Sequence, residues 1–447
     1  MPDSSRVPRD ASSGRGPLTP LHFIVLLGVV SALMDVVYEG ARSVTGPFLA
    51  VLGGSALLIS VVTGAGEAVA LVLRLVFGRL ADRPRLRWRL TLAGYGLTAL
   101  SVPLLGVTNA LWIASVLVLT ERLGKAVRSP AKDSMLANAG AEYGRGKAFA
   151  VHEALDQSGA FVGPLVVAAV ISASGSYSPA FLAMAVPAAV AMTLLIWLSR
   201  RVPNTSVYEV AARPETRATP VEQPPRREGR APVSRRGAGL SRQFWVYAGF
   251  SSLTMLGYAT FGLLAFHLVS TNLMAPAAVG VVYAVAMGVD ALAAVASGWL
   301  YDRVGLRVLV VLPFLAALVP WLAFSTNGAA AAAGVLVWGA AMGVQESTMR
   351  AAVADLAPSA RRGSAYGIFT ACYGLAWLAG SVLIGLLYEQ SVLVLSLVLT
   401  GVQALALVVF LTVRPHHDRW SRGPGGPRGW RAPPWRAASR AQRHTPR

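Results

Sequence analysis

Long apolar runs separated by short polar connections dominate the chain. A first set covers residues 21–50, 56–80, 89–107, 110–130, 146–171 and 178–199, and a second covers 243–270, 276–299, 306–325, 329–356, 363–387 and 392–413. A helix rises about 1.5 Å per residue, so each run can cross a hydrocarbon layer of about 30 Å. The pattern predicts twelve transmembrane helices in two sets of six. The first run is too long to be a cleaved signal peptide.

Three polar segments flank these sets. Residues 1–20, 200–242 and 414–447 are rich in polar side chains, with many Arg and Pro, and show no apolar periodicity. We therefore expect a disordered tail over 1–20, a six-helix bundle over 21–199 and a linker over 200–242. A second bundle should follow over 243–413, with a basic disordered tail over 414–447.

Composition supports a membrane protein over a soluble one. Of the 447 residues, 54% are hydrophobic and only 14% charged, and the mean hydropathy is +0.54. A soluble protein carries about 25% charged residues. The net charge of +19 could indicate nucleic-acid binding, but the basic residues lie in connections and tails, where they anchor helices at the cytoplasmic face. No nucleic-acid partner is expected. The single cysteine, Cys372, cannot form an internal disulfide.

The connections alternate in charge and so predict the orientation. Residues 51–56, 106–110, 172–179, 271–277, 325–330 and 388–391 contain no Lys or Arg, whereas the alternate connections contain nearly all of them. The positive-inside rule then places both termini and the linker in the cytoplasm. We expect a multi-pass protein of the cell's inner membrane.

A short motif occurs once in each half. Gly78-Arg79-Leu80-Ala81-Asp82-Arg83 and Gly298-Trp299-Leu300-Tyr301-Asp302-Arg303 each end the second span of their set. Both resemble the loop signature of the major facilitator superfamily, roughly G-x-L-a-D-r-x-G-r-k. The second copy also has Gly305 and Arg307 in place, while the first has Arg85 where the family has glycine.

The resemblance implies an all-α membrane fold of two pseudo-symmetric six-helix bundles with a solute cavity between them. It also implies that a cytoplasmic gate is formed by the conserved positions of the motif. In this chain those positions are Gly78, Asp82, Arg83, Gly298, Asp302 and Arg303.

Several ionisable side chains lie inside predicted spans. Such groups cost several kcal/mol at membrane depth, so they usually face a cavity and have a function. Asp35 and Glu39 lie four residues apart and share one helix face. We expect proton coupling and substrate contact from Asp35, Glu39, Arg42, Glu67, Arg74, Arg122, His152, Asp156, Asp290, Glu346 and Arg350. The alternative is that ion pairs such as Glu39 with Arg42, or Glu346 with Arg350, only fix helix contacts.

The richer first half resembles proton-coupled members of the superfamily, in which one half carries the protonation site. Gly159 and Gly163 would allow close helix packing, and Pro164 would bend the helix. These three residues resemble the glycine-proline motif in the fifth helix of antiporters. Arg122 is the counterpart of the antiporter arginine in helix four, with Ala126 where glycine is usual.

The chain has no phosphate-binding glycine loop and no metal-ligand spacing, so we expect no enzyme activity, cofactor or metal. Three functions remain open. The first is a proton-coupled antiporter of the drug-efflux type that exports a small molecule. The second is a proton-coupled symporter that imports a polar metabolite or an organic anion held by Arg42, Arg74 or Arg122. The third is a receptor or assembly partner without transport. The expected partners are a small-molecule substrate, protons and the lipid bilayer, and the protein is expected to be a monomer.

Overall fold

The computed structural model describes residues 18–211, 240–357 and 361–412, and within these ranges the chain forms helices and no strand. Most of the tail predicted over 1–20, the whole tail predicted over 414–447 and most of the predicted linker lie outside the described residues. The predicted all-helical fold is confirmed. Its first half contains α1 (Pro20–Val51), α2 (Ala56–Val72), α3 (Arg74–Ala81), α4 (Pro84–Leu105), α5 (Leu111–Tyr143), α6 (Arg145–Ser174), α7 (Tyr177–Ala183) and α8 (Ala185–Arg201).

A short helix, α9 (Ser206–Ala211), follows the first half. The second half contains α10 (Arg242–Leu256), α11 (Phe261–Ser270), α12 (Pro276–Val304), the 3-10 turn η1 (Gly305–Val310), α13 (Val311–Ala323), α14 (Gly328–Leu356), α15 (Arg362–Gln390) and α16 (Val392–Leu411). Three spans are interrupted: α2 and α3 form one, as do α7 with α8 and α10 with α11.

Nine stretches of the described residues are apolar and long enough to cross a membrane. One of them, Pro276–Ala323, holds two spans, α12 and α13. The helices α4 and α5 lie outside those stretches because arginines open α4 and charged side chains run through α5. With these counted, the helices make the twelve spans that the sequence predicts.

The helix α5 differs most from its predicted range of 110–130. It continues through Pro130 to Tyr143. Arg128 and Lys132, which lie close to or beyond the end of the predicted span, are both inside the helix, and Arg128 is buried. Their charges are tolerated because polar side chains of other helices accept hydrogen bonds from them.

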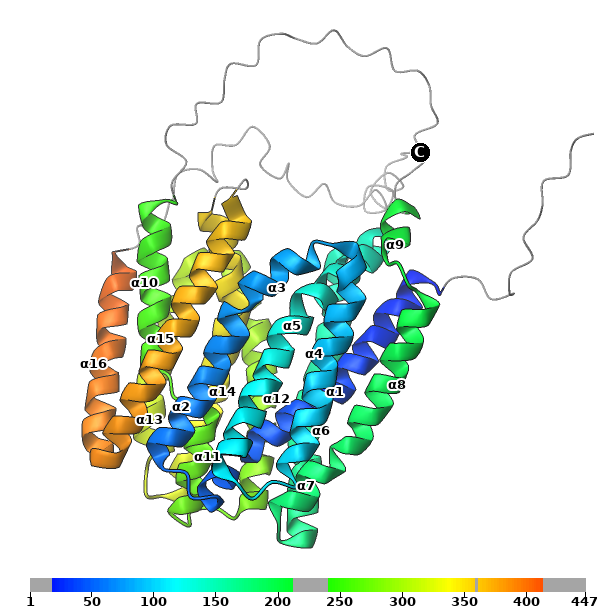
Figure 1. The fold of residues 1–447 in the computed structure, drawn as a ribbon. Coiled ribbons are helices and arrows are strands. Elements are labelled where there is room, and N and C mark those ends of the chain that lie inside the picture. The colour runs from blue at the N-terminus through cyan, green and yellow to red at the C-terminus, as the bar shows by residue number, and fades with distance from the viewer. Residues whose placement is uncertain (1–17, 212–239, 358–360, 413–447) are drawn as a thin grey trace, which may run out of the picture.

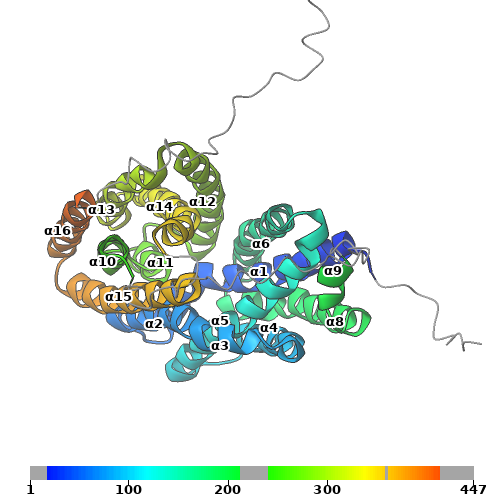
Figure 2. The same cartoon turned by 90° about the horizontal axis from the view of Figure 1, so that it is seen from above.

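The two halves stand side by side (Figure 1). In Figure 1 the start of α1, the end of α8, the helix α9 and the start of α10 all lie at the top. We call this the linker end and the opposite one the far end. Seen from above, α10–α16 form one group and α1 and α3–α8 the other, with α2 beside α15 and α6 facing α12 (Figure 2).

Glycines set the closest helix crossings within each half. A side-chain carbon on Gly159 or Gly163 of α6 would lie 2.2 or 2.4 Å from a backbone oxygen of α1. In the second half, Gly339 and Gly343 of α14 would meet α12 at 2.4 and 2.1 Å. Pro164 lies on the other contact of α6, where its carbonyl approaches Gly280 of α12. Both halves therefore use two glycines four residues apart for a backbone-to-backbone contact.

The halves are closed against each other at the far end. A side-chain carbon on Gly46 of α1 would lie 1.8 Å from the carbonyl oxygen of Gly262 in α11. Next to this contact, the hydroxyls of Thr63 and Thr260 are hydrogen-bonded at 2.7 Å. Asp82 and Asp302, at the linker end, are exposed, and neither makes a salt bridge in the described chain. The described halves are therefore in direct contact at the far end.

Candidate functional site

A cavity lies between the halves, close to the far-end closure. Its charged side chains come from α1, α2 and α5, and the second half contributes residues at the start of α11. The lining consists of Tyr38, Ala41, Arg42, Thr45, Thr63, Glu67, Val102, Leu105, Val118, Glu121, Arg122, Thr260, Phe261 and Gly262. The lining thus combines charged and apolar side chains.

A chain of salt bridges crosses this cavity wall. Arg42 pairs with Glu39 at 3.4 Å and with Glu67 at 2.9 Å. Arg122 in turn pairs with Glu67 at 3.4 Å and with Glu121 at 3.3 Å. All five side chains are almost fully buried, so each depends on its partners to remain charged.

Tyr38 joins a further cation to this chain. Its hydroxyl accepts a hydrogen bond of 2.6 Å from Nζ of Lys125. The ammonium of Lys125 lies 4.4 Å from the ring centroid and the guanidinium of Arg122 4.9 Å from it. We call these seven residues the central cluster: Tyr38, Glu39, Arg42, Glu67, Glu121, Arg122 and Lys125. It contains three carboxylates and three cations and is therefore electrically balanced.

The central cluster is tied to the other half by one direct hydrogen bond. Tyr283 of α12 donates its hydroxyl to Oε2 of Glu39 on α1. The other oxygen of Glu39 faces Arg42. Glu39 therefore connects the charge chain of the first half to the helix that faces it.

A second group of polar residues lies nearer the linker end, between α1, α4, α5 and α6. Lys132 contacts Oδ2 of Asp156 at 3.3 Å and donates to the hydroxyl of Ser31 at 3.0 Å. Tyr95 donates to the same hydroxyl at 3.0 Å, and His152 Nε2 lies 3.5 Å from Asp156. His152 and Asp156 therefore lie on one face of α6.

Asp35 borders this second group. It lies one turn before Glu39 on α1 and is half-buried. Its charge is within electrostatic range of Asp156, Lys132 and Arg128. Among the described residues it makes no salt bridge within 4 Å. Asp35 is thus a carboxylate with no direct ionic partner in this conformation.

Asp290, Glu346 and Arg74 are not among the seven side chains of the central cluster, although the charge of Arg74 is within electrostatic range of Glu67. Asp290 of α12 is buried and its Oδ1 has no hydrogen-bond partner, while Glu346 of α14 is exposed. Arg74 begins α3 and is half-buried. The side chain of Arg350 lies outside the described part of the structure, so the expected pair with Glu346 is not tested.

The charged residues of the duplicated motif, Asp82, Arg83, Asp302 and Arg303, are exposed. Asp82 follows the last residue of α3, and no side chain caps the start of α4, so Asp82 does not act as a helix cap here. Gly78 and Gly298 have open space around them. Arg303 stacks on Trp299 with its guanidinium carbon 3.3 Å from the ring centroid.

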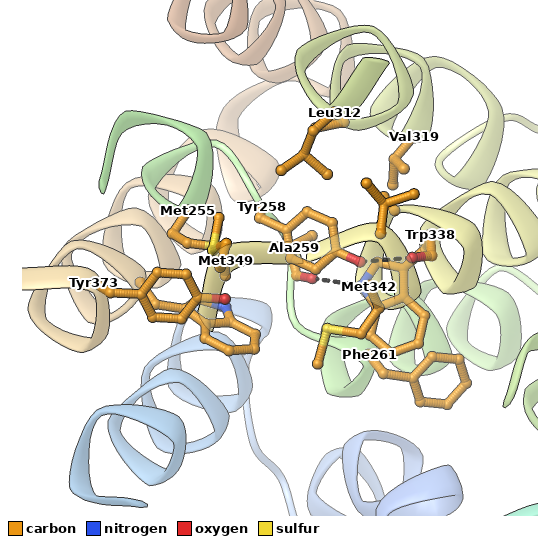
Figure 3. Close-up of a cluster of buried hydrophobic side chains, with 14 of the residues drawn as sticks. Met255, Tyr258, Ala259, Phe261, Leu312, Val319, Trp338, Met342, Met349 and Tyr373 are labelled. Atoms are coloured by element: carbon orange, nitrogen blue, oxygen red, sulfur yellow. Dashed lines mark hydrogen bonds between the residues drawn. The ribbon is translucent and has the colours of Figure 1, made fainter. Parts of the chain in front are cut away.

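The seventh span is broken beside the cavity, between α10 and α11. Two reciprocal hydrogen bonds hold the unwound segment: Tyr258 donates to the carbonyl of Trp338 at 2.6 Å, and the Trp338 indole donates to the carbonyl of Ala259 at 2.9 Å (Figure 3). Phe261, which follows the break, lines the cavity and lies 4.2 Å from the ring of Tyr283. The break therefore places an aromatic side chain of the second half in the cavity lining.

Four members or neighbours of the central cluster were not among the predicted site residues: Tyr38, Glu121, Lys125 and Tyr283. A signal existed for two of them, because Glu121 and Lys125 are charges inside a predicted span. Tyr38 and Tyr283 gave no such signal, because buried tyrosines are ordinary in membrane helices.

Known proteins place this architecture in a family. The family model of the Major Facilitator Superfamily matches residues 27–273 and 251–444. The chain belongs to the major facilitator superfamily. An uncharacterised protein of Mycobacterium tuberculosis is 51% identical over 401 residues, which cover 90% of this chain and 95% of that protein. An uncharacterised MFS-type transporter of Methanocaldococcus jannaschii is 28% identical over 141 residues, 31% of this chain and 35% of that one.

Solved structures share the fold at low identity. The nucleoside transporter NupG superposes with a TM-score of 0.68 at 12% identity, covering 88% of this chain and all of that one. A bacterial homologue of the human lysosomal transporter Spinster, in an inward-facing and unoccupied conformation, gives 0.66 at 13% identity over 89% of this chain and 98% of that one. At such identities the likeness concerns the fold alone. This chain is a multi-pass membrane protein of the transporter type, and family and fold point away from an enzyme.

Proposed function

We propose that this protein is a proton-coupled antiporter that exports a small, largely apolar molecule by alternating access. The observation that carries the proposal is the bond from Tyr283 to Glu39. Because of this bond, the buried carboxylate of Glu39 takes part in the charge chain of the first half and also in the contact between the halves. A proton on that carboxylate would therefore alter both.

The charge chain gives the coupling a physical basis. Protonating Glu39 removes the partner that holds Arg42 from one side, so Arg42 is left with Glu67 alone. Buried ion pairs are strongly destabilised when one member is neutralised, because the other charge stays desolvated. We infer that protonation at Glu39 or Glu67 rearranges the cavity wall and that substrate binding favours the deprotonated arrangement.

The cavity walls support an apolar substrate over an anion. Arg42 and Arg122 already have carboxylate partners, and Lys125 is held by Tyr38. An organic anion would have to displace a carboxylate to reach them. The same lining offers Val102, Leu105, Val118 and Phe261 to an apolar body.

A symporter for an organic anion is the second candidate. It is favoured by one feature, which is that two arginines line the cavity. If Glu67 bound the coupled proton, both arginines would lose a partner and could hold a carboxylate or phosphate. In that case anions should compete with the substrate, and Arg122→Ala should abolish uptake.

The test uses cells that lack or overproduce the protein and a panel of toxic compounds. A compound whose toxicity rises on deletion and falls on overproduction is then added to everted membrane vesicles with a respiration-generated proton gradient. We expect the compound to release protons from the vesicle lumen in the unmodified protein and not in Glu39→Gln. Glu142→Gln, at the exposed end of α5, is the matched control and should behave as the unmodified protein.

Unchanged proton release in both Glu39→Gln and Glu67→Gln would refute coupling through the central cluster. Accumulation of the compound in cells that overproduce the protein would instead favour the symporter.

A further inference from the structure

Glu389 is the single formally charged residue in the connections at the far end. The six connections at 51–56, 106–110, 172–179, 271–277, 325–330 and 388–391 contain no other Asp or Glu, and no Lys or Arg. No cationic side chain of these connections can therefore form a salt bridge with Glu389. The transport chemistry of the central cluster does not use it either.

The structure gives this carboxylate a partner in the opposite half. Oε1 of Glu389, near the end of α15, accepts a hydrogen bond of 2.9 Å from the backbone amide of Leu57. Leu57 is the second residue of α2, whose first amides have no acceptor within their own helix. Ser55 caps the next amide, that of Leu58, at 3.3 Å. Glu389 thus completes the cap of a helix that belongs to the other half.

The electrostatics of Glu389 depend on the two halves being together. A carboxylate in the last turn of its own helix lies at the negative end of the helix dipole, which is unfavourable. The start of α2 presents the positive end of another dipole, which is favourable. When the halves separate at the far end, Glu389 keeps the first environment and loses the second.

The neighbouring contacts between the halves are uncharged. Ser60 donates to the carbonyl of Ser381 at 2.6 Å, and Thr63 is bonded to Thr260 at 2.7 Å. The adjacent Tyr388 is occupied within its own half, where its hydroxyl lies 2.7 Å from Nδ1 of His267. Glu389 is therefore the one ionic contribution to this closure among the described side chains.

We propose that Glu389 is a positioning residue that biases the carrier toward the conformation closed at its far end. It acts by capping α2 across the boundary between the halves. This role depends on the alternating-access fold and is independent of proton coupling, of the substrate and of the direction of transport.

The test measures the opening of the far end directly. Spin labels are attached at Asn109→Cys and Thr326→Cys, which replace exposed residues of different halves, in a Cys372→Ser background. Distances between the labels are recorded in nanodiscs by double electron–electron resonance. We expect one main short distance with Glu389 present. A longer distance should gain population in Glu389→Gln, which keeps an acceptor oxygen without the charge, and still more in Glu389→Ala.

A charge-shifted variant separates capping from net charge. Glu389→Gln combined with Gln390→Glu moves the carboxylate by one residue and keeps the charge of the loop. We expect it to open like Glu389→Gln, whereas Gln390→Ala alone should match the unmodified protein. The proposal is overturned if Glu389→Gln and Glu389→Ala give the unmodified distance distribution, or if the charge-shifted variant restores it. The distances between the labels are measured without transport, so a failure of the proposed proton coupling would not change this result.

Discussion

Each arginine of the central cluster is paired with two carboxylates, and one of those carboxylates is shared between them. Glu67 serves both Arg42 and Arg122, and Tyr38 contacts the two cations of α5. In a buried site such sharing has a consequence, because removing one charge leaves its neighbours desolvated and uncompensated. Single neutralisations should therefore be costly, and matched double neutralisations less so.

Arg122→Ala tests this sharing. It leaves Glu67 with one partner and Glu121 with none, so we expect a loss of about 3–5 kcal/mol in the stability of the first half. Adding Glu121→Gln removes the abandoned charge and should recover part of the loss. Thermal unfolding in nanodiscs measures both. A double variant no more stable than Arg122→Ala would show that Glu121 does not depend on Arg122.

Tyr283→Phe tests the bond between the halves. The ring and its contact with Phe261 remain, but the hydroxyl that reaches Glu39 is lost. We expect slower export with expression unchanged, and we expect Glu39→Gln to add little to that effect because both remove one interaction. The measurement is a double-mutant cycle on export rates, and additive effects would argue against a shared role.

At the scale of helices, the sequence predicts existence and order better than extent or pairing. The apolar runs locate the spans because their length and hydropathy are set by the bilayer. The span predicted over 110–130 ends at Pro130, yet the helix continues to Tyr143. Lys132 can lie inside the protein because its ammonium group pairs with Asp156 of α6 and donates a hydrogen bond to Ser31 of α1. These partners of Lys132 come from other helices, so the sequence of α5 alone does not predict them.

The glycines of α6 provide a test at this scale. Gly163→Leu places a branched side chain where a single carbon would already lie 2.4 Å from the backbone of α1. We expect α1 and α6 to separate and the protein to lose its monodisperse peak in size-exclusion chromatography. Gly401→Leu, on α16 with open space around it, is the control and should leave the peak intact. Equal behaviour of the two variants would show that the α1–α6 contact tolerates bulk.

At the scale of the molecule, the duplicated motif and the two sets of six spans were sufficient to predict the fold. They were not sufficient to predict which half-to-half contacts exist. Neither the bond from Tyr283 to Glu39 nor the cap that Glu389 places on α2 has a sequence signal, because each joins residues more than two hundred positions apart. Long-range partners of this kind follow from the docking of the two bundles, which no local pattern records.

The orientation remains a prediction of the basic connections. Alkaline phosphatase fused after residue 110 or 327 should be active and a cytoplasmic fluorescent reporter at either position dark, since both positions lie in connections without Lys or Arg. The opposite reporter pattern would invert the molecule and place the linker end outside the cell.

The most direct test of alternating access joins the two halves at the far end. Thr63→Cys and Thr260→Cys, in a Cys372→Ser background, place thiols where the native hydroxyls lie 2.7 Å apart. The two cysteines should form a disulfide under mild oxidation, arrest the flux of an exported compound and release it again on reduction, while either single variant stays active. Full flux with the disulfide quantitatively formed would contradict transport by opening and closing of the halves around the central cluster.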